Sequence, residues 1–524
     1  MEKILKYKMD YFLIFFFAFL FFLFLQSAPV LPDPDGFYHA KMTEMISKQG
    51  IVQDFPYLQF TTLKDGYIDQ HFLYHLILIP SLLFSDHLIG IKCLQALINS
   101  VFIFLFYWLL KKEKIKIPLF WTIILITSSP FIFRISLIKA NSLSLIFLFL
   151  GIFFIFNKKY LLLFVLSYFY VWAYGGWPLM LVLAFVFVFS QFLNKKIQRE
   201  SVFRKFCSRL DFLHLYKQKQ KIDFKLIIIC LSGIILGLVL NPYFYKNFYF
   251  YYQQIIQIGL INYQDKINVG GEWYAYPFFE LAQSSLIVFF IFLIALFLFL
   301  ISIKNQNAKS VSLLILSFFF LALTLKSRRY VEYLIPFLVF TSAFIITFSL
   351  KDNFVRDICF LFSKFYKNKK IAFYCSAIFL IFVFSVVTFK EVKRTKQELS
   401  FGSNLTLYKN SAEYLQKYSF KKDIIFHADW DDFPSLFYYN NHNYYILGLD
   451  PTFMYKYDKQ LYDEYARITT GEDSYDLYKK IKYDFNAKFV FFDKNHLALK
   501  HNLMLDNRFV LVYQDEEAEI YEIE

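Results

Sequence analysis

The chain has 524 residues, of which 57% are hydrophobic, 22% aromatic and only 19% charged, and its mean hydropathy is +0.42. A soluble protein is about half apolar and roughly a quarter charged, so repeated apolar runs of about 20 residues indicate a multi-span membrane protein. The net charge of +14 is no nucleic-acid signature. Residues 1–389 hold 38 Lys and Arg against 19 Asp and Glu, whereas residues 390–524 hold 18 against 23.

The apolar runs predict about eleven transmembrane helices. The first run follows Lys3, Lys6 and Lys8 as in a signal sequence, but it lacks a small-x-small cleavage site and is expected to be retained. The segment 72–84 is too short for a crossing and is expected to be interfacial or re-entrant. The predicted spans are 11–28, 88–110, 117–133, 143–156, 160–173, 177–193, 226–242, 284–303, 311–325, 331–350 and 371–389.

The charge of the loops predicts the orientation of the spans. With 72–84 uncounted, the loops of one side hold 27 Lys and Arg in 78 residues and those of the other side hold 10 in 117. Positive loops stay in the cytoplasm. We therefore expect a cytoplasmic N-terminus, an extracytoplasmic C-terminus and large outer loops at 29–87 and 243–283. The basic loop 194–225 is expected to lie on the anionic inner leaflet, with a specific partner as the alternative.

The segment 390–524 alternates short apolar runs with amphipathic ones. Such a pattern predicts a small extracytoplasmic α/β domain that follows a membrane domain over residues 1–389. We expect helices over 410–418 and 459–468, and strands over 423–427, 443–447, 487–492, 509–513 and 519–522.

Two carboxylates, Asp33 and Asp35, follow the first predicted span in the sequence PDPDG. Paired Asp residues at a helix exit suit a divalent cation held against a lipid phosphate. The alternative is an Asx-Pro turn that begins the next amphipathic segment.

Further residues with useful chemistry collect in the predicted outer loops. They are Arg134, Lys139 and Asn141 in one turn, Glu272 in the long loop, Arg329 in another turn, and Asp429-Trp430-Asp431-Asp432 after a predicted strand. Carboxylates for a cation and guanidinium groups for a phosphate suit transfer from a lipid-anchored phosphosugar. A proton-coupled transporter would place ionisable residues in mid-span, where few are found here.

In this order the motifs resemble the catalytic subunit of oligosaccharyltransferases, particularly the single-subunit bacterial form, within the GT-C class of membrane glycosyltransferases. The matching stretches are DPDGFYHAKMTEMISKQG with Asp35, FRISLIKANSLSL with Arg134 and Asn141, NVGGEWYAYP with Glu272, KSRRYVEYLIP with Arg329, and DWDDF in place of the signature WWDYG.

The resemblance implies an inverting glycosyltransferase that moves a sugar or glycan from a polyprenyl-phosphate donor to a protein, glycan or lipid acceptor at the outer face of the cell membrane. It implies catalytic roles for Asp35 and Glu272, and a Mg²⁺ or Mn²⁺ ion held by Asp33, Asp35, Glu272 and Asn141. Arg329 and Arg134 would bind the donor phosphate. Trp430, Asp431 and Asp432 would form part of the acceptor cleft, and loop 243–283 would act as a lid, unless it is an interfacial aromatic belt.

Two departures from the family pattern leave alternatives open. Asn141 stands where an acidic metal ligand is expected, and most of WWDYG is replaced, so an Asn-x-Ser/Thr acceptor is not implied. The alternatives are a polyprenyl-linked glycan flippase or polymerase and a non-catalytic member of the same fold.

Overall fold

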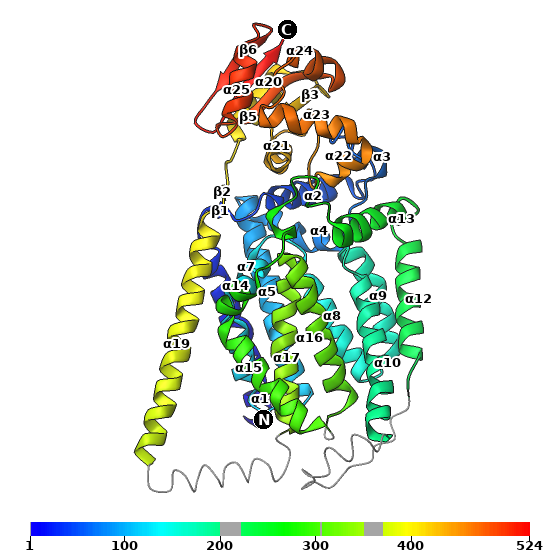
Figure 1. Ribbon diagram of the computed structural model, residues 1–524, viewed down its shortest axis with the longest axis vertical. Coiled ribbons are helices and arrows are strands. Elements are labelled where there is room, and N and C mark those ends of the chain that lie inside the picture. Colours follow the sequence, from blue (N-terminus) through cyan, green and yellow to red (C-terminus); the bar gives the residue numbers. More distant parts are fainter. Residues whose placement is uncertain (1, 200–221, 304–305, 350–369) are drawn as a thin grey trace.

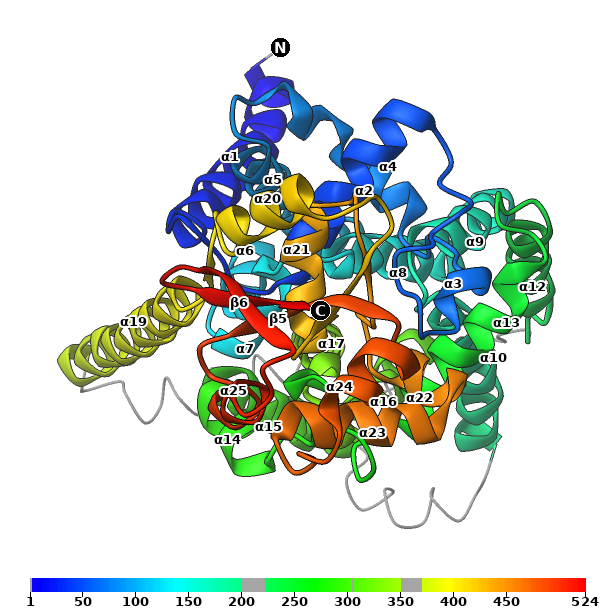
Figure 2. The same cartoon turned by 90° about the horizontal axis from the view of Figure 1, so that it is seen from above.

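The structure is a computed structural model that describes residues 2–199, 222–303, 306–349 and 370–524. Helices form an elongated bundle, a small sheet lies at one end of it, and the N-terminus lies at the opposite end (Figure 1). Viewed along the long axis, the sheet covers the centre of the bundle (Figure 2). Most of the basic loop 194–225 lies outside the described residues.

Each of the eleven predicted spans coincides with helical structure. The helices before the C-terminal sheet are α1 (Glu2–Leu25), α2 (Asp35–Gln49), α3 (Leu63–Gly66), α4 (Phe72–Leu78), η1 (Ile79–Leu83), α5 (His87–Lys112), α6 (Pro118–Leu125), α7 (Ser129–Ser136), α8 (Asn141–Phe156), α9 (Tyr160–Ala173), α10 (Pro178–Arg199), α12 (Lys225–Val239), α13 (Lys246–Tyr251), η3 (Tyr252–Ile261), η4 (Gly271–Trp273), α14 (Phe278–Ser284), α15 (Leu286–Ile301), α16 (Ala308–Lys326), η6 (Arg328–Tyr330), α17 (Val331–Ser349) and α19 (Lys370–Ser400).

Four helices among the described residues are long and apolar enough to cross a membrane: α5, α10, α16, and η6 with α17. Two bent helix pairs, α6 with α7 and α14 with α15, raise the number to six. Several other predicted spans are apolar helices that are shorter than a straight crossing requires. The chain is thus a multi-span membrane protein, and the count of eleven, like the interfacial place of segment 72–84, stays a prediction.

The predicted span 117–133 is broken. Helices α6 and α7 meet at an angle of 76°, and Ser128, which precedes α7, has an extended backbone with φ −114° and ψ 105°. Pro130 stands in the first turn of α7, where its missing N–H costs nothing, but it cannot continue a preceding helix. The break turns α7 so that Arg134, in its last turn, reaches the pocket described below.

All five strands expected after residue 390 are present. They form one mixed sheet in the order β4-β3-β5-β7-β6, in which β3 is parallel to β4 and β5, and β7 is antiparallel to β5 and β6. The four residues of β3 are all buried, as is usual for a central parallel strand. The strands are β3 (Ile424–His427), β4 (Tyr444–Tyr445), β5 (Ala487–Asp493), β6 (Phe509–Gln514) and β7 (Ala518–Ile523). The helices are α20 (Lys409–Tyr418), η7 (Trp430–Asp432), α21 (Phe433–Tyr439), α22 (Thr452–Tyr457), α23 (Lys459–Thr470), α24 (Leu477–Lys479), η8 (Lys480–Asp484) and α25 (Leu497–Met504).

The loop 29–87 is joined to this C-terminal sheet. Strand β1 (Val30–Leu31) pairs with β2 (Ser403–Asn404), which follows α19. Leu58 forms a parallel bridge with Tyr445 at the edge of the sheet. The ring of Phe37, in α2, lies 5.8 Å from that of Tyr438, in α21. These contacts hold the beginning of α2, with Asp33 and Asp35, beneath the sheet.

Candidate active site

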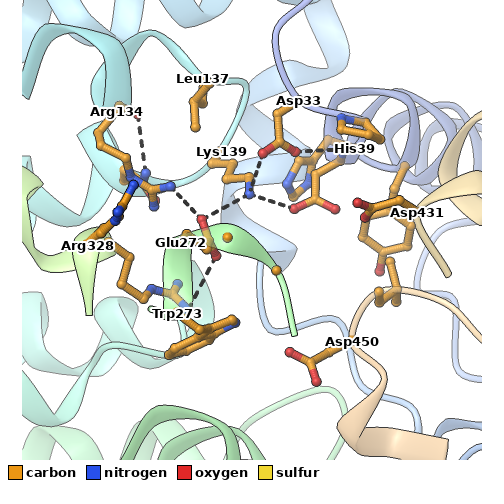
Figure 3. A pocket seen from close by; sticks show the side chains of 18 of the residues that line it. Asp33, His39, Arg134, Leu137, Lys139, Glu272, Trp273, Arg328, Asp431 and Asp450 are labelled. Atoms are coloured by element: carbon orange, nitrogen blue, oxygen red, sulfur yellow. Dashed lines mark hydrogen bonds and ion pairs between the residues drawn. The ribbon is translucent and has the colours of Figure 1, made fainter. Parts of the chain in front are cut away.

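A pocket of about 550 Å³ lies between the helical bundle and the C-terminal sheet (Figure 3). Its walls come from α2, α7, η4, η6, α19, η7 and the segment before α22. It is lined by eight of the nine residues assigned above to catalysis, metal, phosphate or acceptor: Asp33, Asp35, Arg134, Asn141, Glu272, Arg329, Trp430 and Asp431. Packing thus brings together side chains from distant parts of the chain.

The two carboxylates at the start of α2 share one cation. Lys139 Nζ lies 2.9 Å from Asp33 Oδ2 and 2.9 Å from Asp35 Oδ2. The other oxygen of Asp33 accepts a hydrogen bond of 2.9 Å from the backbone N–H of Asp35. The Asx turn is therefore present, and it is the turn itself that directs both carboxylates at Lys139.

Glu272 is the centre of a second set of ion pairs. Its Oε2 lies 2.5 Å from Arg134 Nη1 and 3.5 Å from Lys139 Nζ, and its Oε1 lies 3.7 Å from Arg329 Nη1. Arg134 is also paired with the buried Glu332 at 3.1 Å. Through Lys139, Glu272 and the Asp33–Asp35 pair belong to one network of alternating charges.

The short helix η4 is fixed in place by the turn before α17. Ser327 Oγ donates to the carbonyl of Glu272 at 2.9 Å. The guanidinium of Arg329 lies 4.2 Å above the ring of Trp273, and its Nη2 donates to Tyr174 Oη at 3.1 Å. A guanidinium stacked on an aromatic face keeps its N–H groups free to bind an anion. The contacts with Trp273 and Tyr174 therefore orient Arg329 before any ligand binds.

Burial and the neighbouring charges set the protonation of the loop residues in the network. Burial raises the pKa of Asp35 to about 6. The Lys139 ammonium lowers this pKa, and the nearby Asp33 carboxylate raises it further. Burial would lower the pKa of Lys139, but the carboxylates of Asp33 and Asp35 hold that pKa well above its usual range. Burial would likewise raise the pKa of Glu272, but Lys139 and Arg134 hold it well below its usual range. Lys139 and Glu272 are therefore both charged.

The arginines lie on one side of the pocket together with Glu272, and Asp33 and Asp431 lie on the other side. Figure 3 shows Arg134 and Arg328 on one side of Lys139, and Asp33, His39 and Asp431 on the other. Arg329 lies on the same side as Arg134, because both residues pair with Glu272. This separation presents guanidinium groups to one part of a ligand and carboxylates to another.

The donor set does not fit the expected metal ion. Lys139 already lies between the carboxylates of Asp33, Asp35 and Glu272. The side-chain nitrogen of Asn141 donates to the carbonyl of Arg134 at 3.4 Å. Over the described ranges, no three His, Cys, Asp or Glu side chains converge as ligands. A divalent cation bound to the same carboxylates would be repelled by the Lys139 ammonium. The metal ion therefore stays a prediction, and the arrangement of these side chains does not favour it.

Of the three residues expected at the acceptor cleft, Trp430 and Asp431 line the pocket and Asp432 does not. The position of Asp432 outside the pocket lining has a local cause. Asp432 turns back along η7, where its Oδ2 accepts from the backbone N–H of Asp429 at 3.2 Å as half of a capping box. The ring of Trp430 instead lies against Gly270 in the loop that carries Glu272.

Sequence reasoning counted Lys139 among the outer-loop residues with useful chemistry but assigned it no role, and it did not single out His39 or Asp450. All three residues line the pocket. Lys139 stands in a four-residue segment between α7 and α8 that is otherwise apolar, and a lone lysine in such a segment was a usable signal. His39 is four residues after Asp35, on the same face of α2. Asp450 carried no signal, because only the packing of the sheet on the bundle brings it to the pocket.

Fold and pocket together define a polytopic membrane protein with a charged pocket beneath a small C-terminal sheet. The chain matches the Alg9-like mannosyltransferase family over residues 53–440, and it belongs to that family. It is therefore a membrane glycosyltransferase. A comparison with curated protein sequences finds no significant match.

Solved structures share the fold at low identity. The archaeal oligosaccharyltransferase AglB from Archaeoglobus fulgidus is 12% identical with a TM-score of 0.60, over 99% of this chain and 74% of that one. ArnT from Cupriavidus metallidurans is 11% identical with a TM-score of 0.54, over 98% of both chains. The arabinofuranosyltransferase AftD from Mycobacteria is 10% identical with a TM-score of 0.55, over 98% of this chain and 40% of that one. The fold is thus GT-C-like, as the resemblance implied.

Proposed function

We propose that the protein transfers a sugar from a polyprenyl-phosphate donor to an acceptor hydroxyl, with mannose as the sugar that its family indicates. One observation carries the proposal: a single pocket presents Arg329 and Arg134 on one side and Asp33 and Asp35 on the other, with Lys139 between them. A glycosyl transfer needs an anion site for the leaving phosphate and, on the other side of the sugar carbon, a group that accepts a hydrogen bond from the attacking hydroxyl.

The arginine side suits the donor phosphate. Arg329 is stacked on Trp273, and the 3.7 Å between its Nη1 and Glu272 Oε1 is the longest of the ion-pair distances of Glu272. A phosphate oxygen can replace that contact with a shorter, charge-assisted hydrogen bond. Arg328, which is exposed at the pocket wall, adds a further positive charge. The AglB structure holds a dolichol-phosphate and the ArnT structure an undecaprenyl phosphate, which supports a lipid phosphate in this fold.

The carboxylate side suits the acceptor. In this proposal, Asp35 accepts a hydrogen bond from the attacking hydroxyl and orients it toward the anomeric carbon. The bond from carbon to phosphate oxygen breaks on the opposite face, and the phosphate leaves with the electron pair, so the anomeric configuration inverts. Trp430 offers an aromatic face to a sugar acceptor. Lys139 and the arginines stabilise the charge that develops on the leaving phosphate.

The orientation belongs to the same proposal. The N-terminus and the C-terminal sheet lie at opposite ends of the molecule, which is consistent with an N-terminus in the cytoplasm and a sheet outside. The pocket would then open beside the outer headgroups, where a translocated polyprenyl-phosphate sugar presents its phosphate.

The test uses the full chain in lipid nanodiscs. Polyprenyl-phosphate mannose is supplied with octyl α-mannoside as acceptor, and released polyprenyl phosphate and the disaccharide product are measured by mass spectrometry. We expect both products from the wild type and neither from Asp35→Ala or Arg329→Ala. Binding of the donor without release, also in the presence of Mn²⁺ or Mg²⁺ and with other lipid-linked sugars, would support a non-catalytic or flippase role instead.

A further inference from the structure

A chain of three buried titratable side chains leads from the protein interior to the pocket. His75 Nδ1 lies 2.7 Å from Asp69 Oδ2, and His75 Nε2 lies 2.8 Å from His39 Nδ1. Asp69 and His39 are each 3% exposed and His75 is fully buried. None of the three takes part in the ion pairs of Lys139 and Glu272.

For an ionised Asp69 and a neutral His75, the two hydrogen bonds define the tautomer of both histidines. An ionised carboxylate only accepts, so His75 donates from Nδ1 to Asp69. A neutral imidazole has one donor and one acceptor nitrogen, so His75 Nε2 accepts and His39 Nδ1 donates to it. The remaining nitrogen of His39, Nε2, therefore carries a lone pair and no proton.

This nitrogen is available to a ligand. His39 lines the pocket four residues after Asp35, and Figure 3 shows it on the carboxylate side. The described residues offer its Nε2 no hydrogen-bond partner. The rings of Tyr74 and His71 lie 5.3 and 5.2 Å from the imidazole and hold it on the other sides.

We propose that His39 Nε2 accepts the proton of the acceptor hydroxyl, and that His75 and Asp69 are positioning residues that hold His39 in the required tautomer. This proposal rests on the proposed function. The hydroxyl oxygen forms its bond to the anomeric carbon, its proton moves to Nε2, and the polyprenyl phosphate leaves with the electron pair of the broken bond. The proton then passes to water at the mouth of the pocket.

The surroundings keep His39 neutral before the reaction, and they also oppose the positive charge that it gains during the reaction. Burial, and then the neighbouring His75 and His71 with a smaller effect of Lys139, lower the pKa of His39 well below its usual range. Burial also lowers the pKa of His71 to about 3, so the other histidine facing His39 is neutral. The positive charge that forms on His39 is offset through His75 by the carboxylate of Asp69, as a carboxylate supports an imidazole base in hydrolase triads.

The decisive variant is Asp69→Asn, because it leaves His39 and Asp35 unaltered. An amide nitrogen facing His75 Nδ1 would donate instead of accept. Both tautomers would then reverse, and His39 Nε2 would carry a proton. We expect kcat to fall by about 10²–10⁴ in Asp69→Asn and in His39→Gln, the usual contribution of a general base. His87→Gln, a histidine at the start of α5 outside the pocket, is the matched control and should retain wild-type kcat.

The assay is the mannose transfer described above, combined with the Kd for polyprenyl phosphate and the unfolding midpoint of each variant. A fall in kcat with Kd unchanged within about twofold supports the proposal. Wild-type kcat in both Asp69→Asn and His39→Gln, or an equal loss of binding and folding in both, overturns it. A wild-type protein that neither binds polyprenyl phosphate nor releases it from the donor refutes the proposed function itself.

Discussion

The ammonium of Lys139 lies 2.9 Å from a carboxylate oxygen of Asp35, one of the residues that the sequence predicts as metal ligands. The same ammonium contacts Asp33 and Glu272. A fixed cation of this kind needs no ligand exchange, and it balances the carboxylates before any substrate binds. The charge of the pocket is therefore built into the chain.

Replacing Lys139 with Met should abolish transfer, because three carboxylates would lose their shared counter-charge. Removing one partner from a buried ion network destabilises by about 3–5 kcal/mol, and the unfolding midpoint should fall accordingly. Lys48→Met, an exposed lysine on α2, is the matched control.

The activity of the wild-type protein should persist when divalent cations are removed with EDTA, because Lys139 already balances the carboxylates. Loss of activity in EDTA with recovery in Mn²⁺ would favour the divalent cation that the sequence predicts.

Transfer should depend on pH through Asp35, whose pKa is raised to about 6 by burial. Below that pH the carboxyl is protonated, so it loses its charge and its hold on the acceptor hydroxyl. The rate should therefore rise with pH between about 5 and 7, where the ionised fraction changes most. Asp35→Asn should be inactive across this range although it still inserts and folds. A wild-type rate in Asp35→Asn would remove Asp35 from the reaction.

Arg329 should govern donor affinity. Its fork of donors is stacked on Trp273, and a lysine ammonium cannot reproduce this geometry. We expect Arg329→Lys to raise the Kd for polyprenyl phosphate by about tenfold, equal to ~1.4 kcal/mol, as measured by calorimetry. Lys326→Arg, at the end of α16, serves as a control for the substitution of one cation by another. An unchanged Kd in Arg329→Lys would place the donor phosphate elsewhere.

Substitutions of Asp432 and Trp430 should have different effects: the first should lower stability, and the second should weaken use of the acceptor. Asp432→Ala removes half of a capping box and should cost about 1 kcal/mol of unfolding free energy, with transfer kinetics unchanged. Trp430→Ala should raise the acceptor KM, because it removes the aromatic face offered to the acceptor. Thermal unfolding and product analysis of both variants check these outcomes. A raised acceptor KM in Asp432→Ala would restore it to the acceptor site.

Much of the architecture follows from local patterns. The apolar runs predicted helices that the structure contains, and the strands expected after residue 390 all form. Local reasoning missed the break at Pro130, because a proline near the end of an apolar run is compatible with either one span or two helices. The same break aims Arg134 at the pocket, so one local ambiguity affected the geometry of the site.

The sequence by itself determined the membrane class, the helices and strands, and which acidic and basic residues stand in the connecting loops, because these depend on composition and on short-range periodicity. Only the tertiary structure decided that Lys139 joins Asp33, Asp35 and Glu272, that Asp69 reaches the pocket through two histidines, and that Asp432 turns away from it. Such pairings depend on how helices pack and on distances between residues far apart in the chain, and no local pattern encodes those distances.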